Sequence, residues 1–171
     1  GSTALKMVQG VRNSMIRGNK FYDLSGGAVT IGEPTRNDPA IFDPPDSRLL
    51  MKNNDVVNNY IHDIGVEYRS ASAISAGFPV DMDISHNEIF NIPYSGIHIG
   101  YGWQFIPTSA IRNVRIERNF IYDLLGAGLY DGGAVYTLGG TGGTADSPNV
   151  IAENYIKNQM NQSGALYPDE G

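Results

Sequence analysis

The stretch Ile116–Leu124 reads IERNFIYDL, and its pattern occurs five times along the chain. The other four copies are Ile16–Leu24 (IRGNKFYDL), Val56–Ile64 (VVNNYIHDI), Ile84–Ile92 (ISHNEIFNI) and Ile151–Gln159 (IAENYIKNQ). Each copy has a β-branched residue first, Asn fourth, a large apolar residue sixth and Asp or Asn eighth. The ninth residue is Leu or Ile, except for Gln159. Such self-similarity indicates a repeat architecture, which decides the fold class.

The repeated asparagines are Asn19, Asn59, Asn87, Asn119 and Asn154. They are 40, 28, 32 and 35 residues apart. Short β-branched and aromatic runs separated by Asn, Gly and Asp favour short strands and tight turns over helices. Coils of such strands would stack equivalent side chains about 4.8 Å apart, which makes ladders of Ile, of Phe and of Asn. The sequence therefore predicts an all-β, single-stranded, right-handed parallel β-helix of about five coils.

A β-propeller is the alternative repeat fold, because its blades recur every ~40–45 residues. Each blade, however, needs four antiparallel strands joined by hairpins. Here the lengths between fixed nonapeptides vary by a dozen residues. Variable loops at one corner of a coil explain that variation, so the β-helix is favoured.

The bulk composition limits the classes of partner. The 171 residues carry a net charge of −6 and contain no basic run and no cysteine. We therefore expect no nucleic-acid partner, no disulfide and no thiolate metal site. No segment approaches ~18 continuous apolar residues and no secretory leader is visible, so we expect no membrane partner. Residues 1–171 read as one β-helix domain without end caps, which suggests a piece of a longer protein.

Each coil carries a second aligned strand. The five runs are Gly26–Gly32, Ser72–Ala76, Ser95–Gly100, Gly133–Thr137 and Gly164–Pro168. By the period-two rule, the side chains expected to point inward are Val29, Ile74, Ile97, Val135 and Leu166. Those expected to form an outward column are Thr30, Ser75, His98, Tyr136 and Tyr167. Tyr101 and Trp103 follow His98 and would lie at the rim of this column, and Glu33–Ser47 reads as an irregular wall.

The acidic residues fall into two groups. Asp23, Asp63 and Asp123 belong to the repeat and read as structural turn residues. Asp81 and Asp83 flank an inward Met82 and could contribute to a calcium site, but two carboxylates are too few for an oxygen site. We therefore expect no cofactor, with calcium as the alternative.

Asp131, Asp169 and Glu170 fall outside the repeat. Asp131 precedes Gly132-Gly133, where the backbone can pack closely, and Asp169 ends the second strand one coil further on. Two carboxyl groups are what glycosidic bond cleavage needs: one protonates the leaving oxygen and the other acts as nucleophile or base. Aromatic side chains in the column would pack on sugar faces.

Three segments resemble right-handed β-helix glycoside hydrolases, the nearest being glycoside hydrolase family 141, whose members include α-L-fucosidases and xylanases. They are Ser95–Trp103 (SGIHIGYGW), Asp131–Gly139 (DGGAVYTLG) and Ala165–Gly171 (ALYPDEG). The resemblance implies a pectate-lyase-like solenoid in which Asp131 and Asp169 are the catalytic pair. Where the family usually has Leu, this chain has Pro168.

The resemblance also implies a carbohydrate substrate of plant or host origin, further coils and domains as partners, and a secreted, periplasmic or cell-surface location. The substrate-binding candidates are His98, Tyr101, Trp103, Tyr136, Tyr167 and Glu170. Two other functions stay open: a polysaccharide lyase or epimerase on the same fold, and a glycan-binding or structural coil without catalysis. A lyase must neutralise a uronate carboxylate, for which the outward column offers no Arg or Lys; Arg69 and Arg112 lie near strand edges.

Overall fold

The computed structural model describes residues 3–34, 38–102, 109–126, 128–160 and 162–170. In these residues the strands form three parallel sheets, which we call A, B and C. Sheet A contains β1 (Thr3–Met7), β4 (Gly27–Ile31), β7 (Ile74–Ala76), β10 (Ile97–Ile99), β13 (Val135–Leu138) and β16 (Leu166–Asp169). Sheet B contains β2 (Arg12–Arg17), β5 (Met51–Val57), β8 (Pro79–Ser85), β11 (Arg112–Glu117) and β14 (Val150–Ala152). Sheet C contains β3 (Lys20–Phe21), β6 (Tyr60–His62), β9 (Glu88–Ile92), β12 (Phe120–Leu124) and β15 (Tyr155–Gln159).

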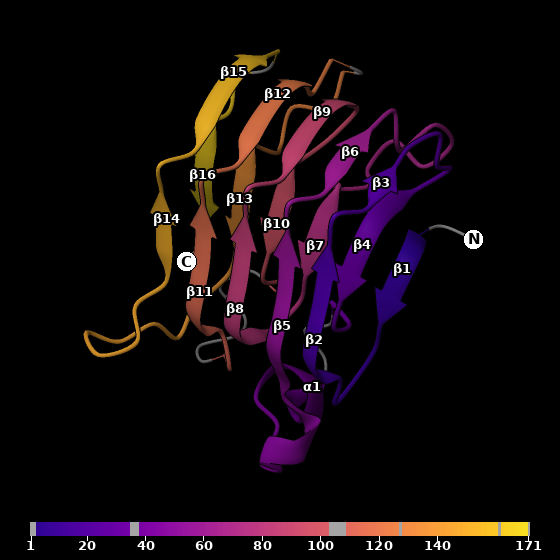
Figure 1. Cartoon of the computed structure of the whole chain (residues 1–171). Coiled ribbons are helices and arrows are strands. Elements are labelled where there is room, and N and C mark those ends of the chain that lie inside the picture. Colours follow the sequence, from indigo (N-terminus) through magenta and orange to yellow (C-terminus); the bar gives the residue numbers. More distant parts are fainter. Residues whose placement is uncertain (1–2, 35–37, 103–108, 127, 161, 171) are drawn as a thin grey trace.

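The chain visits the sheets in the fixed order A, B, C, and neighbouring strands within a sheet come from successive passes. Each pass through sheets B, C and A forms one coil, so that coil 1 is β2–β4 and coil 5 is β14–β16. Figure 1 shows the strands as stacked ladders, with β1 at one end and β14–β16 at the other. This all-β arrangement is consistent with the predicted β-helix. Among the described residues, no helix has the length and apolar character needed to cross a bilayer.

The five repeated asparagines form a hydrogen-bonded ladder, as the sequence predicts. Each Nδ2 donates to the Oδ1 of the next Asn at 3.0 Å, from Asn19 through to Asn154. The backbone N–H of each Asn donates to the same oxygen. Asn59, Asn87 and Asn119 are buried. Because their amides are fully paired, the buried polar groups do not weaken this corner.

Two positions of each repeat lie in the left-handed region of backbone space. The residue before each ladder Asn has a φ between 55° and 70°, and it is Gly18, Asn58, His86, Arg118 or Glu153. This residue turns the chain from sheet B into sheet C. The eighth repeat position has a φ between 49° and 53° in all five copies. Asp and Asn tolerate this conformation better than most residues, which explains why only they occur there.

The inward side chains form one core in the middle of the stack. Ile84 and Ile116 are 0% and 2% exposed, as their repeat position predicts. At the last coil the equivalent Ile151 is 39% exposed and Leu166 is 48% exposed. These two differ from the prediction because β14 and β16 are the outermost strands, with no strand of the described chain stacked on them.

The stretch Glu33–Ser47, expected to be irregular, contains one turn of helix, α1 (Pro39–Phe42). Asp38 caps it by accepting from the Ala40 N–H at 2.9 Å. A short 3-10 helix, η1 (Ser47–Leu49), follows. Asp38 before the helix and Pro39 at its first position favour a helix start, which explains why this part of the stretch is helical and not irregular.

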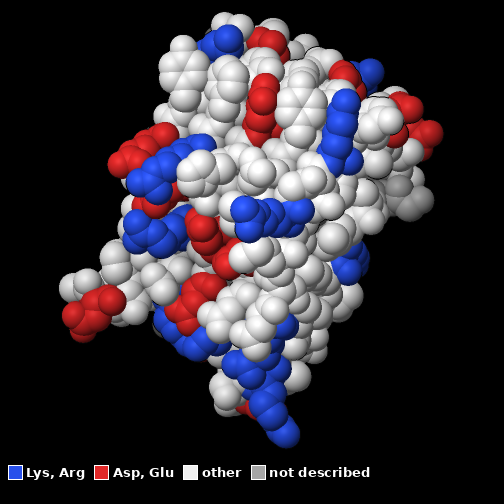
Figure 2. Space-filling view, viewed as in Figure 1, with Lys and Arg blue, Asp and Glu red and all other residues white. Residues whose placement is uncertain are grey.

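Charged side chains of both signs are mixed over the face formed by sheets B and C (Figure 2). Several of them pair: Arg115 with Glu117 at 2.5 Å, and Lys52 with Asp81 at 3.0 Å. This face is therefore a paired, solvated surface rather than a region of one charge.

Candidate active site

The outward column predicted on the second strands is present on sheet A. The register pairs Thr30 with Ser75, Ser75 with His98, His98 with Tyr136, and Tyr136 with Tyr167. The column starts one strand earlier than the sequence predicts, at Lys6 of β1, which pairs with Thr30. Ring centroids are 4.8 Å apart for His98 and Tyr136, and 5.2 Å apart for Tyr136 and Tyr167.

Asp169 lies on the same side of β16 as Tyr167, because it follows two residues later. Its register partner is Leu138 on β13. The Tyr136 hydroxyl donates to Asp169 Oδ2 at 2.7 Å. A tyrosine of one coil therefore holds the carboxylate of the next coil.

Asp131 is positioned by Tyr94 and Ser95 of the preceding coil. The Tyr94 hydroxyl donates to the Asp131 carbonyl oxygen at 2.6 Å, and the Gly133 N–H donates to Ser95 Oγ at 3.3 Å. A Cβ on Gly132 would lie 2.7 Å from both Ser95 Oγ and the Tyr94 ring. This contact is the physical reason for the glycine, whose close packing the sequence predicted. The sequence did not predict a role for Tyr94, and its position just before the Ser95 strand is the only feature of the sequence that could have indicated one.

The two carboxylates act on the same pair of tyrosines. Burial raises the pKa of Tyr136 well above its usual value, and the hydrogen bond to Asp169 and the charge of Asp131 raise it further. Burial is also the main cause that raises the pKa of Tyr167, and the negative charges of Asp169 and Asp131 raise it further. Both phenols therefore stay protonated at neutral pH and remain hydrogen-bond donors. The structure thus brings Asp131, Asp169, Tyr136 and Tyr167 together in one cluster.

His98 lies beside this cluster as a neutral ring. Its Nε2 is buried and has no hydrogen-bond partner among the described residues. Burial lowers the pKa of His98 to about 4. At neutral pH the imidazole is therefore uncharged.

The remaining binding candidates are Tyr101, Glu170 and Trp103. Tyr101 is partly buried against the hydrophobic core, and Glu170 is exposed at the end of β16 with a φ of 51°. Trp103 lies outside the described residues.

The suggested calcium ligands are engaged with protein groups. Asp81 pairs with Lys52 and accepts from Asn113 Nδ2 at 2.9 Å, while Asp83 accepts from Ser85 Oγ at 2.9 Å. The hydrogen bond from Asn113 is the main cause that lowers the pKa of Asp81. In the described part of the chain, no three His, Cys, Asp or Glu side chains gather in a way that could hold a metal ion.

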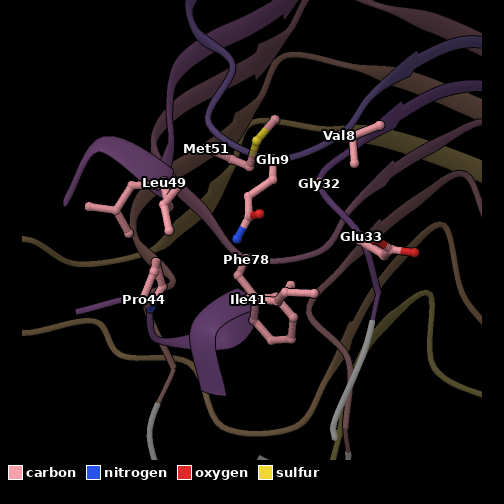
Figure 3. A pocket seen from close by; sticks show the side chains of 10 residues that line it. Val8, Gln9, Gly32, Glu33, Ile41, Pro44, Leu49, Met51 and Phe78 are labelled. Carbon is pink, nitrogen blue, oxygen red and sulfur yellow. The ribbon is translucent and has the colours of Figure 1, made fainter. Parts of the chain in front are cut away.

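The described residues also enclose hollows outside the aspartate–tyrosine cluster. The first, in Figure 3, lies between α1 and β5, where Gln9 donates to the Ala40 carbonyl at 3.0 Å above Ile41 and Phe78. Its volume is only about 10 Å³, which leaves room for about one water. It is therefore a small gap in apolar packing beside the core and not a ligand site.

The second hollow has a volume of about 200 Å³ and is lined by inward side chains such as Ile116, Thr137 and Ile151. It belongs to the interior under the last coil. The third, about 460 Å³, lies at the corner between sheets C and A, around Pro93. Pro93 directly precedes Tyr94, so this groove begins next to the aspartate–tyrosine cluster.

Neither a protein-family model nor a curated protein matches the chain. Among solved structures, the chain is similar to one described as "Glycoside hydrolase", with 30% identity and a TM-score of 0.81. The similarity covers 97% of this chain and 27% of that chain. The chain thus spans about a quarter of the length of that structure and shares the fold of this part of a glycoside hydrolase.

Proposed function

We propose that this chain is a right-handed parallel β-helix that forms the catalytic core of a glycoside hydrolase related to family 141. The observation that carries the proposal is the cluster on adjacent coils of sheet A, where the Tyr136 hydroxyl donates to Asp169 and the charges of Asp131 and Asp169 both act on Tyr136 and Tyr167. The similarity to a solved glycoside hydrolase supports the same reaction class.

In the proposed mechanism, one carboxyl group of the pair Asp131 and Asp169 is protonated and donates its proton to the glycosidic oxygen as the bond breaks. The other is ionised and attacks the anomeric carbon or removes a proton from the attacking water. Tyr136 stays protonated, and its hydroxyl holds the Asp169 carboxylate in position. Tyr167 also stays protonated beside both carboxylates. If the carboxyl oxygens lie about 5–5.5 Å apart the reaction retains the anomeric configuration, and at roughly 6.5–9.5 Å it inverts it.

Substrate contacts are assigned to the edge of the column. Tyr136 is only 3% exposed, so it holds Asp169 and does not contact the sugar, contrary to the sequence expectation. The ring of Tyr167 supplies apolar surface for a sugar, and His98, Tyr101, Trp103 and Glu170 complete the proposed contacts. The substrate is a plant or host oligosaccharide or polysaccharide, met outside the cell. In the whole protein, further coils and domains would contact this core.

The direct test is hydrolysis by this chain of a panel of neutral and uronic-acid oligosaccharides, with Asp131→Asn and Asp169→Asn as variants. We expect reducing sugar from the wild type and a loss of about 10²–10⁴-fold in rate for each variant, the range for an acid or base catalyst. Asp146→Asn, on an exposed loop, is the matched control and should keep the wild-type rate.

Three outcomes would overturn the proposal. An absorbing unsaturated product from a uronic-acid substrate would identify a lyase. Binding without turnover would leave a glycan-binding module. Normal turnover by Asp131→Asn or Asp169→Asn would show that the catalytic pair lies elsewhere.

A further inference from the structure

The corner between sheets C and A is uneven because the coils cross it with connections of different length. β9 ends at Ile92 and β10 begins at Ile97, so coil 3 crosses in four residues, 93–96. The crossing of coil 2 runs over residues 63–73, and that of coil 4 over residues 125–134. Two long loops therefore flank one short turn.

Each of the two long loops also contacts the coil on its far side. The coil 2 loop bonds back toward coil 1, where the Val66 N–H donates to the Leu24 carbonyl at 3.1 Å and the Tyr68 N–H donates to the Ser25 carbonyl at 2.8 Å. The coil 4 loop approaches coil 5, where a Cβ on Gly126 would lie 3.2 Å from the Met160 sulfur. The floor left between them is Pro93, and the space is the groove of about 460 Å³.

The lining of this groove combines polar and apolar groups. Arg69 is exposed, and among the described residues its guanidinium has no hydrogen bond or ion pair. Asp63, Asn91 and Asp123 stand on successive coils at the eighth repeat position. Val66 is 56% exposed and Met160 is 62% exposed, so the walls present bare apolar surface to solvent.

We infer that this groove, which we call the Pro93 groove, binds an uncharged sugar residue of the glycan that reaches the Asp131–Asp169 cluster. The inference rests on the proposed function and extends it. The Tyr94 hydroxyl bonds the Asp131 carbonyl while its neighbour Pro93 forms the groove floor, so a glycan in the groove continues to the cluster.

The chemistry of the lining selects a neutral sugar. Sugar hydroxyls both donate and accept, and Arg69 supplies donors while Asp63 and Asp123 supply acceptors. Asp123 accepts from Asn158. Asp63 accepts from Asn91 on Oδ1, while its Oδ2 lies 2.6 Å from His62 Nδ1. A carboxylate has about four acceptor positions, so each aspartate keeps capacity for a sugar hydroxyl. Two carboxylates against one guanidinium disfavour an acidic sugar. Pro93, Val66 and Met160 match the C–H faces of a sugar ring, and the volume lies in the ordinary range for small-ligand sites.

The test measures binding of neutral hexasaccharides of xylose, mannose, arabinose and galactose, and of hexagalacturonate, to the whole chain by calorimetry. Val66→Trp fills the groove, and Glu67→Trp places the same ring on the same loop outside the lining as the matched control. We expect at least one neutral hexasaccharide to bind the wild type and Glu67→Trp equally. Val66→Trp should bind it at least about 10-fold more weakly, and Arg69→Gln about 10-fold more weakly because a charge-assisted hydrogen bond is lost.

Each opposite result overturns the inference. These results are unchanged binding by Val66→Trp, binding of hexagalacturonate in preference to the neutral probes, and no binding of any neutral probe to the wild type. The hydrolysis test separates the two proposals. Turnover that Val66→Trp leaves intact contradicts the groove alone, whereas groove-dependent binding without any turnover contradicts the catalytic proposal alone.

Discussion

The corner between sheets B and C and the corner between sheets C and A belong to the same coils but differ in regularity. At the first, every coil turns with one left-handed residue and then the ladder Asn, and the amides bond at 3.0 Å throughout. At the second, the crossings differ in length, and they carry Arg69, Tyr94 and Asp131. The repeat therefore provides stability, while departures from it provide the groove and the candidate carboxylate.

The largest effect on stability is expected on the regular side. Ile84→Ala should cost about 2–5 kcal/mol of unfolding free energy, because Ile84 is fully buried between Val56 and Ile116 and the void cannot collapse. Ile151→Ala removes the same side chain at the open end, where it is 39% exposed, and should cost less than about 1 kcal/mol. Urea unfolding of both variants checks the contrast, and equal costs would refute it.

The regular part of the fold could be predicted because its constraints recur in each coil. The asparagine ladder and the buried Ile84 and Ile116 follow from a pattern that a single misplaced residue would break. The left-handed residue before each Asn could not be predicted, since Gly18, His86 and Arg118 share no side-chain chemistry. Backbone geometry, which stacking imposes, sets the conformation there.

The candidate site was predictable only in part. Register arithmetic on the second strands places His98, Tyr136 and Tyr167 in one column, and the structure has those pairs. Tyr94 and the Pro93 groove depend on two long loops that flank one short turn and on hydrogen bonds between coils, and neither has a periodic signal in the sequence. The exposure of Leu166 depends on which strand is outermost, a property of the stack rather than of the residue.

The second-largest change in unfolding free energy is expected on sheet A, where burial of His98 makes the fold less stable at acidic pH. Its pKa falls from 6.5 in the unfolded chain to about 4 in the folded one because of burial. Between these values the unfolded state binds more protons, so stability present above pH 6.5 is lost as the pH falls toward 4. The loss is at most about 3 kcal/mol.

The measurement for His98 is urea unfolding at pH 7 and pH 4 for the wild type and His98→Leu, which has no group to protonate there. The wild type should lose more stability between the two pH values than the variant does. Equal losses would show that the imidazole reaches solvent and titrates normally.

A smaller effect is expected from Tyr94, on the irregular corner. Tyr94→Phe removes the 2.6 Å hydrogen bond to the Asp131 carbonyl and leaves the ring packing in place. A hydrogen bond of this kind contributes about 1 kcal/mol, so hydrolysis should slow by roughly 5–10-fold in kcat with little change in KM. Steady-state kinetics tests this, with Tyr68→Phe on the neighbouring loop as the control. A change confined to KM would place Tyr94 in substrate binding instead of positioning.

The smallest effect returns to the regular corner, at His86. Its φ is 57°, in the left-handed region where a side chain strains the backbone, and the equivalent position of coil 1 is Gly18 with a φ of 70°. The His86 side chain is exposed. Glycine removes the strain but adds flexibility to the unfolded chain, so His86→Gly should raise the unfolding free energy by only about 0.5–1 kcal/mol. His86→Ala keeps the Cβ and the strain, and should give no gain. If thermal unfolding shows both variants destabilised to the same extent, the imidazole itself stabilises the turn, and stacking alone does not account for the regularity of this corner.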